Sequence, residues 1–225
     1  EKECEGLGIE ARAIDNLVDQ IWEDQAPKPD SVVRVFPEEI AGTPSEEKRK
    51  NIAKELKETD VYATILTLPD SIAWLLNIRG QDVEYIPLIL SYAIIDNNGH
   101  AQWFVEESRV SENTRAHMGA NITIVAPDLM AQSIEALTTA ANEAGQSIGV
   151  DYIRSSIWFK TQIEAAGGRS TALKDPCILP KALKTEAEKN AIRAAHVDDG
   201  VAMVKFLHWV DVEAPKGHLN ELDID

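Results

Sequence analysis

The chain has 225 residues, with 22 basic and 38 acidic side chains, which gives it a net charge of −16 near neutral pH. This acidic balance disfavours nucleic acid as a partner, because binding phosphates requires clustered lysine and arginine. No stretch approaches the roughly 18 consecutive apolar residues of a membrane span, and residues 1–25 lack the pattern of a secretory signal, so we expect a cytoplasmic protein that does not enter a membrane.

The N-terminal part is expected to be irregular apart from one short helix. The segment Asn16–Trp22 has the spacing of an amphipathic helix. Residues 26–44 contain four prolines and no sustained periodicity, so we interpret them as a linker or an irregular crossing between units.

The following segment carries the signals of a helix start. Thr43, Pro44 and Glu46 match the N-cap, N1 and N3 positions of a capping box, and the helix is predicted to run to about Thr59. A run rich in β-branched residues then predicts a buried strand at 61–68.

The middle of the chain alternates between strand and helix patterns. Asp70 is predicted to cap a short helix, and two apolar runs at 87–96 and 100–106 flank an Asn-Asn-Gly turn at 97–99, a strong hairpin signal. The remaining predictions are a strand at 121–126, a helix at 128–144, a strand at 147–151, a helix at 155–168 and a strand at 169–173. Together these elements predict one α/β domain, roughly residues 45–175, with a mixed sheet flanked by helices.

The C-terminal part is predicted to be mainly one long helix. Thr185 and Glu188 form a second capping box, and the apolar spacing predicts a helix at 186–212. A lone helix of this length does not bury its apolar face by itself. We therefore expect it to pack on a domain or partner that is not in this sequence.

Residue patterns for catalysis are weak. His196 and Asp199 lie one helical turn apart and could share a metal, but no third ligand is suggested and a solvated histidine is the simpler interpretation. Asp223 and Asp225 form a D-x-D pair of the kind that can hold a divalent cation, although a terminal acidic pair is usually solvated. We therefore assign no catalytic and no metal-binding residue in this chain.

The stretch "NIRGQDVEYIP" is the most distinctive candidate for ligand contact. Arg79 offers a planar fork of donors suited to a carboxylate, and Gly80 lets the backbone turn beside it. Tyr85 adds a polar group. Alternatively, Arg79 pairs only with Asp82 or Glu84 nearby, and the two interpretations stay open on the sequence.

Several segments together resemble a known family. The stretch "PDSIAWLLNIRGQDVEYIPLILSYAII" closely resembles the second domain of three-domain aminopeptidase P, the metal-dependent Xaa-Pro aminopeptidase of the cytosolic eukaryotic kind. "NLVDQIW", "IAGTPSEEKRKNIAKEL" and "LPKALKTEAEKNAIRAAHVDDGVAMVKFLHWV" resemble the same family in the same order. The resemblance therefore covers nearly the whole chain.

The resemblance implies a fragment of a larger enzyme. Residues 1–44 correspond to the end of a first creatinase-like domain and a linker, 45–175 to the whole second creatinase-like α/β domain, and 176–225 to the incomplete start of a pita-bread catalytic domain. In this family two metals, usually manganese, are held by two aspartates, a histidine and two glutamates, all of which are expected beyond this sequence. The parent enzyme, expected to be a homodimer, removes the N-terminal residue from peptides with proline second, and this chain alone is expected to be inactive.

Two further expectations follow from the resemblance. Loops of the second domain could help to form the wall of the substrate groove, which makes Arg79 and Tyr85 candidate substrate contacts. The alternative is a non-catalytic creatinase-like module that binds peptides or basic proteins such as histones, which would suit the net charge of −16.

Overall fold

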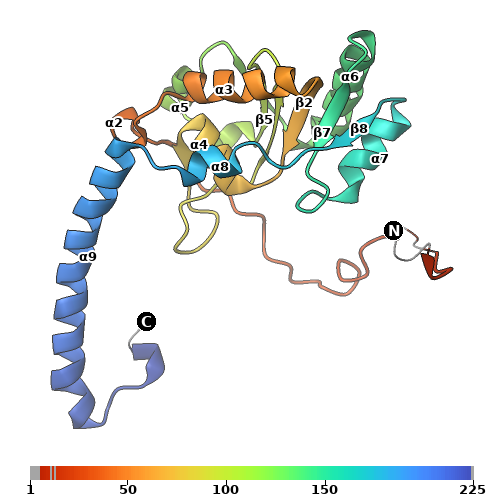
Figure 1. The fold of residues 1–225 in the computed structure, drawn as a ribbon. Helices are drawn as coiled ribbons and strands as arrows, with labels where there is room; N and C mark the ends of the chain where they lie inside the picture. Colours follow the sequence, from red (N-terminus) through yellow and green to blue (C-terminus); the bar gives the residue numbers. More distant parts are fainter. Residues whose placement is uncertain (1–5, 11, 13, 224–225) are drawn as a thin grey trace. The chain divides into compact units, whose positions relative to one another are not determined.

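The computed structural model describes the chain apart from residues 1–5, 11, 13 and 224–225 (Figure 1). It divides into two units, residues 1–30 and 31–225. In the first unit, Asn16–Trp22 forms turns, so the helix predicted there is wrong. Leu17 and Ile21 are exposed, and so short a segment gains too little from its own hydrogen bonds to form a stable helix without a packing partner.

The centre of the second unit is a mixed six-stranded sheet, which confirms the predicted fold class. Its strands, in spatial order, are β6 (Ile122–Val125), β5 (Ala101–Phe104), β4 (Tyr92–Asp96), β2 (Val61–Leu66), β7 (Ser147–Val150) and β8 (Ser170–Ala172). β4 is antiparallel to both of its neighbours, while the other strands run in one common direction. The carboxyl ends of five strands therefore meet at one edge of the sheet.

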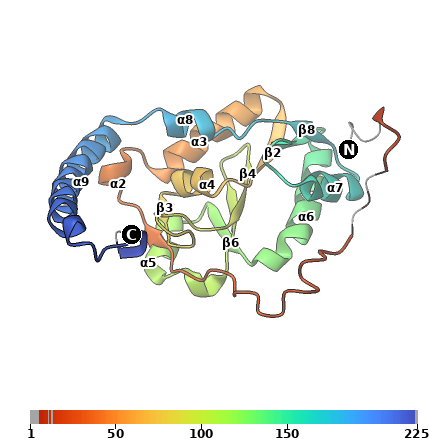
Figure 2. The ribbon, with the colours of Figure 1, turned by 90° about the horizontal axis from the view of Figure 1, so that it is seen from below.

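Helices cover both faces of this sheet (Figure 2). One face packs against α3 (Ser45–Glu58), α4 (Pro69–Leu76) and α5 (Glu112–Met118), and the other packs against α6 (Met130–Glu143) and α7 (Ile157–Ala165). The alternation along β4 shows why: Ala93 and Ile95 belong to the first core, whereas Ile94 belongs to the second. Successive side chains of a strand point to opposite faces, so one apolar strand contributes to both cores.

Two of the predicted helix starts differ from the structure. α3 begins at Ser45 with Pro44 at its N-cap and no side-chain cap, so the predicted capping box of Thr43 and Glu46 is wrong. Glu46 instead forms an ion pair with Lys50, 2.6 Å apart. α4 begins two residues earlier than expected, with Leu68 rather than Asp70 at the N-cap, so the cap predicted at Asp70 is also wrong.

The predicted hairpin is confirmed. β4 and β5 pair as antiparallel strands across the turn at 97–99, where Gly99 has a φ of 84°. The side chain of Asp96 accepts hydrogen bonds from the backbone N–H groups of Asn98 and His100, at 2.8 and 2.9 Å. Arg49, on α3, donates to the carbonyl oxygen of Gly99 at 2.5 Å.

The proline-containing crossing at residues 31–44 is partly ordered into short elements. It contains β1 (Arg34–Val35) and α2 (Glu38–Ala41), and β1 pairs as an antiparallel strand with β3 (Ile78–Arg79). Val33 is fully buried in the first core. This segment is therefore packed against the sheet domain.

The C-terminal part contains α8 (Ile178–Ala182) and α9 (Glu186–Glu213). α9 begins with the predicted capping box, in which Thr185 accepts from the N–H of Glu188 and Glu188 accepts from the N–H of Thr185. α9 has no buried residue in the described structure. Among the described residues, no helix is both long and apolar enough to cross a membrane.

Candidate functional site

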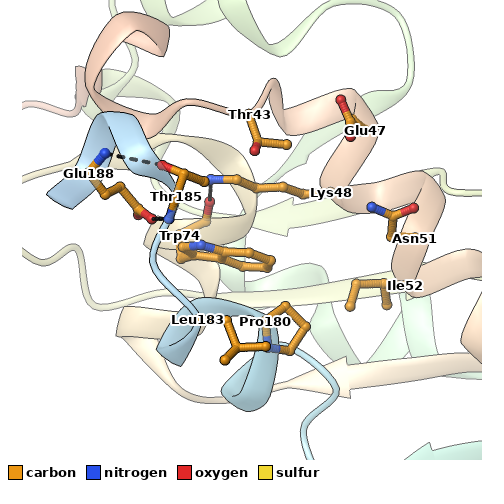
Figure 3. Close-up of a pocket in the computed structure, with 10 residues that line it drawn as sticks. All are labelled: Thr43, Glu47, Lys48, Asn51, Ile52, Trp74, Pro180, Leu183, Thr185 and Glu188. Carbon is orange, nitrogen blue, oxygen red and sulfur yellow. Dashed lines mark hydrogen bonds between the residues drawn. The ribbon is translucent and has the colours of Figure 1, made fainter. Parts of the chain in front are cut away.

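A small pocket lies where α3, α4, α8 and the start of α9 meet (Figure 3). Its volume is about 190 Å³. It is lined by Thr43, Glu47, Lys48, Asn51, Ile52, Trp74, Pro180, Leu183, Thr185 and Glu188. The pocket therefore brings together residues from the predicted sheet domain and residues from the predicted catalytic-domain start.

Lys48 is the central charged group of this pocket. It is only 4% exposed, and its Nζ donates to the carbonyl oxygen of Trp74 at 2.9 Å and to Oδ1 of Asn77 at 2.6 Å. Nζ also lies 4.6 Å from the centre of the Trp74 ring. The pKa of Lys48 is lowered to about 8, mainly by burial, and the carboxylate of Glu188 offsets part of this lowering. Lys48 thus joins α3 to α4 at an appreciable cost of burying its charge.

Asn77 is the first residue of the "NIRG" stretch, and its backbone explains why the apolar helix stops there. It has a φ of 51°, the left-handed conformation that ends α4, and asparagine tolerates this conformation better than most side chains. Its side chain bonds on both sides, because Nδ2 donates to the carbonyl oxygen of Thr43 at 2.9 Å while Oδ1 accepts from Lys48. The end of α4 is therefore fixed to the start of α3.

Arg79 follows in β3, and its guanidinium turns back toward the protein. The group lies 3.9 Å from the centre of the Phe36 ring, and Nη1 donates to the carbonyl oxygens of Ala73 and Ile78 at 3.1 and 2.8 Å. Burial lowers the pKa of Arg79, while the charge of Glu188 raises it. Within the described residues Arg79 has no carboxylate partner in an ion pair, so the predicted local pair with Asp82 or Glu84 is wrong.

Asp82 pairs with Arg109 instead of with Arg79. Both Asp82 oxygens accept from Nη2 of Arg109 at 2.6 Å, and Oδ1 also accepts from the hydroxyl of Ser31 at 2.5 Å. The two ion-pair side chains are 0% and 7% exposed. Burial by itself raises the pKa of Asp82, but the hydrogen bonds from Arg109 and Ser31 lower it below its ordinary value. This buried pair anchors the loop that follows β3.

Tyr85 lies at the exposed tip of that loop. It is 86% exposed and has a φ of 62°. It lines an open surface hollow of about 630 Å³ together with Arg34, Gln81, Asp82, Val83, Glu84, Ile86 and Pro87. Arg79 does not line this hollow, so the two predicted substrate contacts are near in sequence but face different surroundings.

The acidic and histidine candidates that the structure describes do not form a metal site. His196 and Asp199 are both exposed on α9. Asp223 accepts a hydrogen bond from the N–H of Asn220 at 2.8 Å, and Asp225 lies outside the described residues. In the part of the chain that the structure describes, no three His, Cys, Asp or Glu side chains gather where they could hold a metal ion. These residues do not fit a two-metal centre.

The sequence did not single out Lys48, Arg109 or the charge of Glu188. Lys48 belongs to a Lys-Arg-Lys run that is typical of a solvated helix face, and yet Lys48 and Arg49 are both buried. The one usable signal is spacing, since Lys48, Ile52 and Leu56 follow the helical period and share the buried side of α3.

Comparisons with known proteins agree on one family. Residues 24–188 match the model of the creatinase/prolidase N-terminal domain. A protein of Penicillium rubens named "Probable Xaa-Pro aminopeptidase P" is 30% identical over 213 residues, which cover 93% of this chain and 35% of the relative. A protein of the same name from Talaromyces marneffei is 31% identical over 222 residues, covering 96% and 33%.

A solved structure is similar over almost the full chain. The crystal structure of an X-prolyl aminopeptidase from Caenorhabditis elegans, a cytosolic enzyme with a di-nuclear active site, superposes with a TM-score of 0.87 at 26% identity. The match covers 99% of this chain and 36% of that enzyme. The chain spans about a third of the length of the curated relatives that it matches.

Proposed function

Because this chain belongs to the creatinase/prolidase N-terminal domain family, we propose that it is a supporting part of an Xaa-Pro aminopeptidase of the aminopeptidase P type. The parent enzyme removes the N-terminal residue from peptides with proline in second position. The names of the relatives support this proposal over a non-catalytic module that binds peptides or basic proteins.

One observation carries the proposal. The chain superposes over 99% of its length on the C. elegans X-prolyl aminopeptidase, so the similarity includes α8 and α9 as well as the sheet. The match is therefore not limited to a fold that many unrelated proteins share.

We divide the chain as the end of a first creatinase-like domain at 1–44, a second such domain at 45–175, and the start of a catalytic domain at 176–225. The pocket around Lys48 supports a close connection between the last two parts. Lys48 belongs to α3, Thr185 and Glu188 belong to the cap of α9, and all three line the same pocket. The second domain would thus fix the first turn of the catalytic domain.

The metal chemistry is proposed to belong to residues outside this chain. The described residues offer no ligand set for two metals, and the C. elegans enzyme has a di-nuclear active site. We propose two divalent ions, manganese being the expected metal, together with a homodimeric parent enzyme in the cytosol. Because the described residues lack such a ligand set, we propose that the chain is inactive alone.

Arg79 and Tyr85 are proposed to contribute to the substrate groove of the parent enzyme. The exposure of Tyr85 supports a direct contact. Among the described residues, Arg79 uses only Nη1 in hydrogen bonds, so Nε and Nη2 keep N–H groups for a peptide carboxylate or carbonyl. Its bonds to α4 would also hold the base of the loop that carries Tyr85.

The test compares this chain with the longer polypeptide that contains it. Release of the N-terminal residue from an Xaa-Pro peptide is measured with and without added Mn²⁺. The longer polypeptide should show metal-dependent release and the 225-residue chain should show none. Clear metal-dependent release by the 225-residue chain, or none by the longer polypeptide, would contradict the proposal.

The roles of Arg79 and Tyr85 are tested in the longer polypeptide. If they contact substrate, Arg79→Ala and Tyr85→Ala should lower kcat/KM in variants that remain folded. Unchanged kinetics together with a lower unfolding temperature for Arg79→Ala would show that its bonds to α4 and β3 are purely structural.

A further inference from the structure

A second hollow lies at the edge of the sheet where the carboxyl ends of β2, β5, β6, β7 and β8 meet. It has a volume of about 300 Å³ and is formed by the start of β4, the start of α6 and the start of α7. Its lining residues are Tyr92, Pro127, Met130, Ser156, Trp158 and Phe159. In open α/β sheets this edge is where ligands characteristically bind.

The hollow is built from three aromatic rings in fixed positions. Phe159 is 4% exposed and lies at the base, while Tyr92 and Trp158 are 43% and 38% exposed. Each of the two exposed rings packs edge-on against Phe159, with centroid distances of 5.6 and 5.1 Å. Because both rings pack against Phe159, they should lose little side-chain entropy when a ligand binds between them.

The polar tips of the exposed rings are available to a ligand. Neither the indole N–H of Trp158 nor the hydroxyl of Tyr92 bonds to another residue that the structure describes, whereas Trp103 donates to Ser91 at 3.1 Å and Tyr152 donates to Ser170 at 2.8 Å. The hollow therefore combines apolar ring faces with free hydrogen-bond donors. A proline-rich segment complements both, because it offers apolar rings and carbonyl acceptors but no N–H at each proline.

The charge of the chain indicates which proline-rich segments would bind best. The chain carries a net charge of −16, and Asp128, next to Pro127, is exposed. An acidic surface attracts basic partners, and the faces of Trp158 and Tyr92 favour a cation in contact with them. A lysine or arginine beside the prolines would therefore strengthen binding.

We propose that the hollow formed by Tyr92, Trp158 and Phe159 is a docking site for basic, proline-rich peptide segments in an extended conformation. The site is separate from the pocket at Lys48 and from the hollow at Tyr85. The proposal rests on these aromatic residues and on the acidic charge of the chain, and it does not depend on peptidase activity.

The test is a titration of the 225-residue chain with three hexapeptides, followed by calorimetry. The first contains prolines and arginines, the second replaces proline by alanine, and the third replaces arginine by glutamate. All three are acetylated and amidated, so no free N-terminus is present for an aminopeptidase and the result is independent of the proposed reaction. We expect saturable binding of the first peptide, and at least roughly threefold weaker binding of the other two.

Variants locate the binding. Trp158→Ala should weaken binding roughly tenfold, and Tyr92→Phe, which keeps the ring and the packing on Phe159, should weaken it roughly threefold. Trp209→Ala is the matched control, because Trp209 on α9 is also 38% exposed, and it should bind like the wild type. Circular dichroism checks that each variant is folded.

Three results would overturn the proposal. One is equal affinity for the proline and alanine peptides. Another is unchanged affinity in a folded Trp158→Ala variant. The third is an absence of peptide binding combined with self-association of the chain that Trp158→Ala abolishes, which would make a second copy the occupant.

Discussion

Replacing Lys48 by methionine removes a buried lysine whose pKa the fold lowers to about 8. Methionine has a similar length and keeps the apolar contact with Trp74, but it cannot donate to Trp74 or Asn77. The loss of these two hydrogen bonds should destabilise the variant by an amount that does not depend on pH. The titration of Lys48 adds a second contribution to the difference in stability, and this contribution depends on pH.

The sign of the pH effect follows from the lowered pKa. In the unfolded chain Lys48 keeps the ordinary lysine pKa near 10.4, so the unfolded state binds more protons than the folded state above about pH 8. The penalty of the buried charge is therefore fully present below about pH 8 and is relieved as the pH rises toward 10.4. Between about pH 7 and about pH 9.5, the free energy of unfolding of the wild type should rise by about 2 kcal/mol relative to Lys48→Met.

The assay is urea unfolding of both proteins across this pH range, with Lys50→Met as a control. Lys50 lies two residues further along α3 and its side chain is 69% exposed. Its removal should leave the pH dependence of the wild type unchanged. Parallel pH profiles for the wild type and Lys48→Met would refute the reasoning, because they would show that Lys48 keeps an ordinary pKa in the folded protein.

Three other substitutions test contacts that fix the fold. Thr185→Ala should lower the free energy of unfolding by about 1 kcal/mol through loss of the helix cap, and Thr185→Ser should restore most of it in the same urea titration. Asp82→Asn should lower the free energy of unfolding by about 3 kcal/mol, because it leaves a buried arginine without its charged partner. Since the pKa of Asp82 is lowered in the fold, the wild type should lose this stability as the pH falls below about 4, whereas the variant should not. Gly80→Ala should lower the free energy of unfolding by about 2 kcal/mol or more, because a Cβ there would lie 1.8 Å from Ile89. Gly200→Ala is the control: its Cβ would meet no atom within 4 Å, and calorimetry should show no loss of stability.

Short-range sequence patterns predicted the turns and helix caps that are stabilised by residues close together in the sequence. The turn at 97–99 forms because Gly99 adopts a positive φ and Asp96 bonds to the backbone beside it. The cap of α9 forms because Thr185 and Glu188 lie three residues apart and satisfy each other's N–H groups. The order of strands and helices was likewise predictable from hydrophobic periodicity.

The candidate site was much less predictable because its partners are distant in sequence. Lys48 bonds to Asn77, 29 residues away, and Asp82 pairs with Arg109, 27 residues away. The expected partner of Asp82 was Arg79, which is closer in sequence but faces Phe36. Short-range spacing predicts the helix that carries a charged residue, but only the packed fold determines which charges are buried together.

The start of α9 has a consequence for the order of folding. The hydroxyl of Thr185 donates to the carbonyl oxygen of Ala41 at 3.2 Å, and Gly42 leaves room for it, since a Cβ there would lie 2.5 Å from that hydroxyl. Forming the first turn is the costly step in making any helix. Here α2 provides part of that turn's hydrogen bonding, so α9 should nucleate at Thr185 only after the sheet domain has placed α2, and then elongate toward its C-terminus.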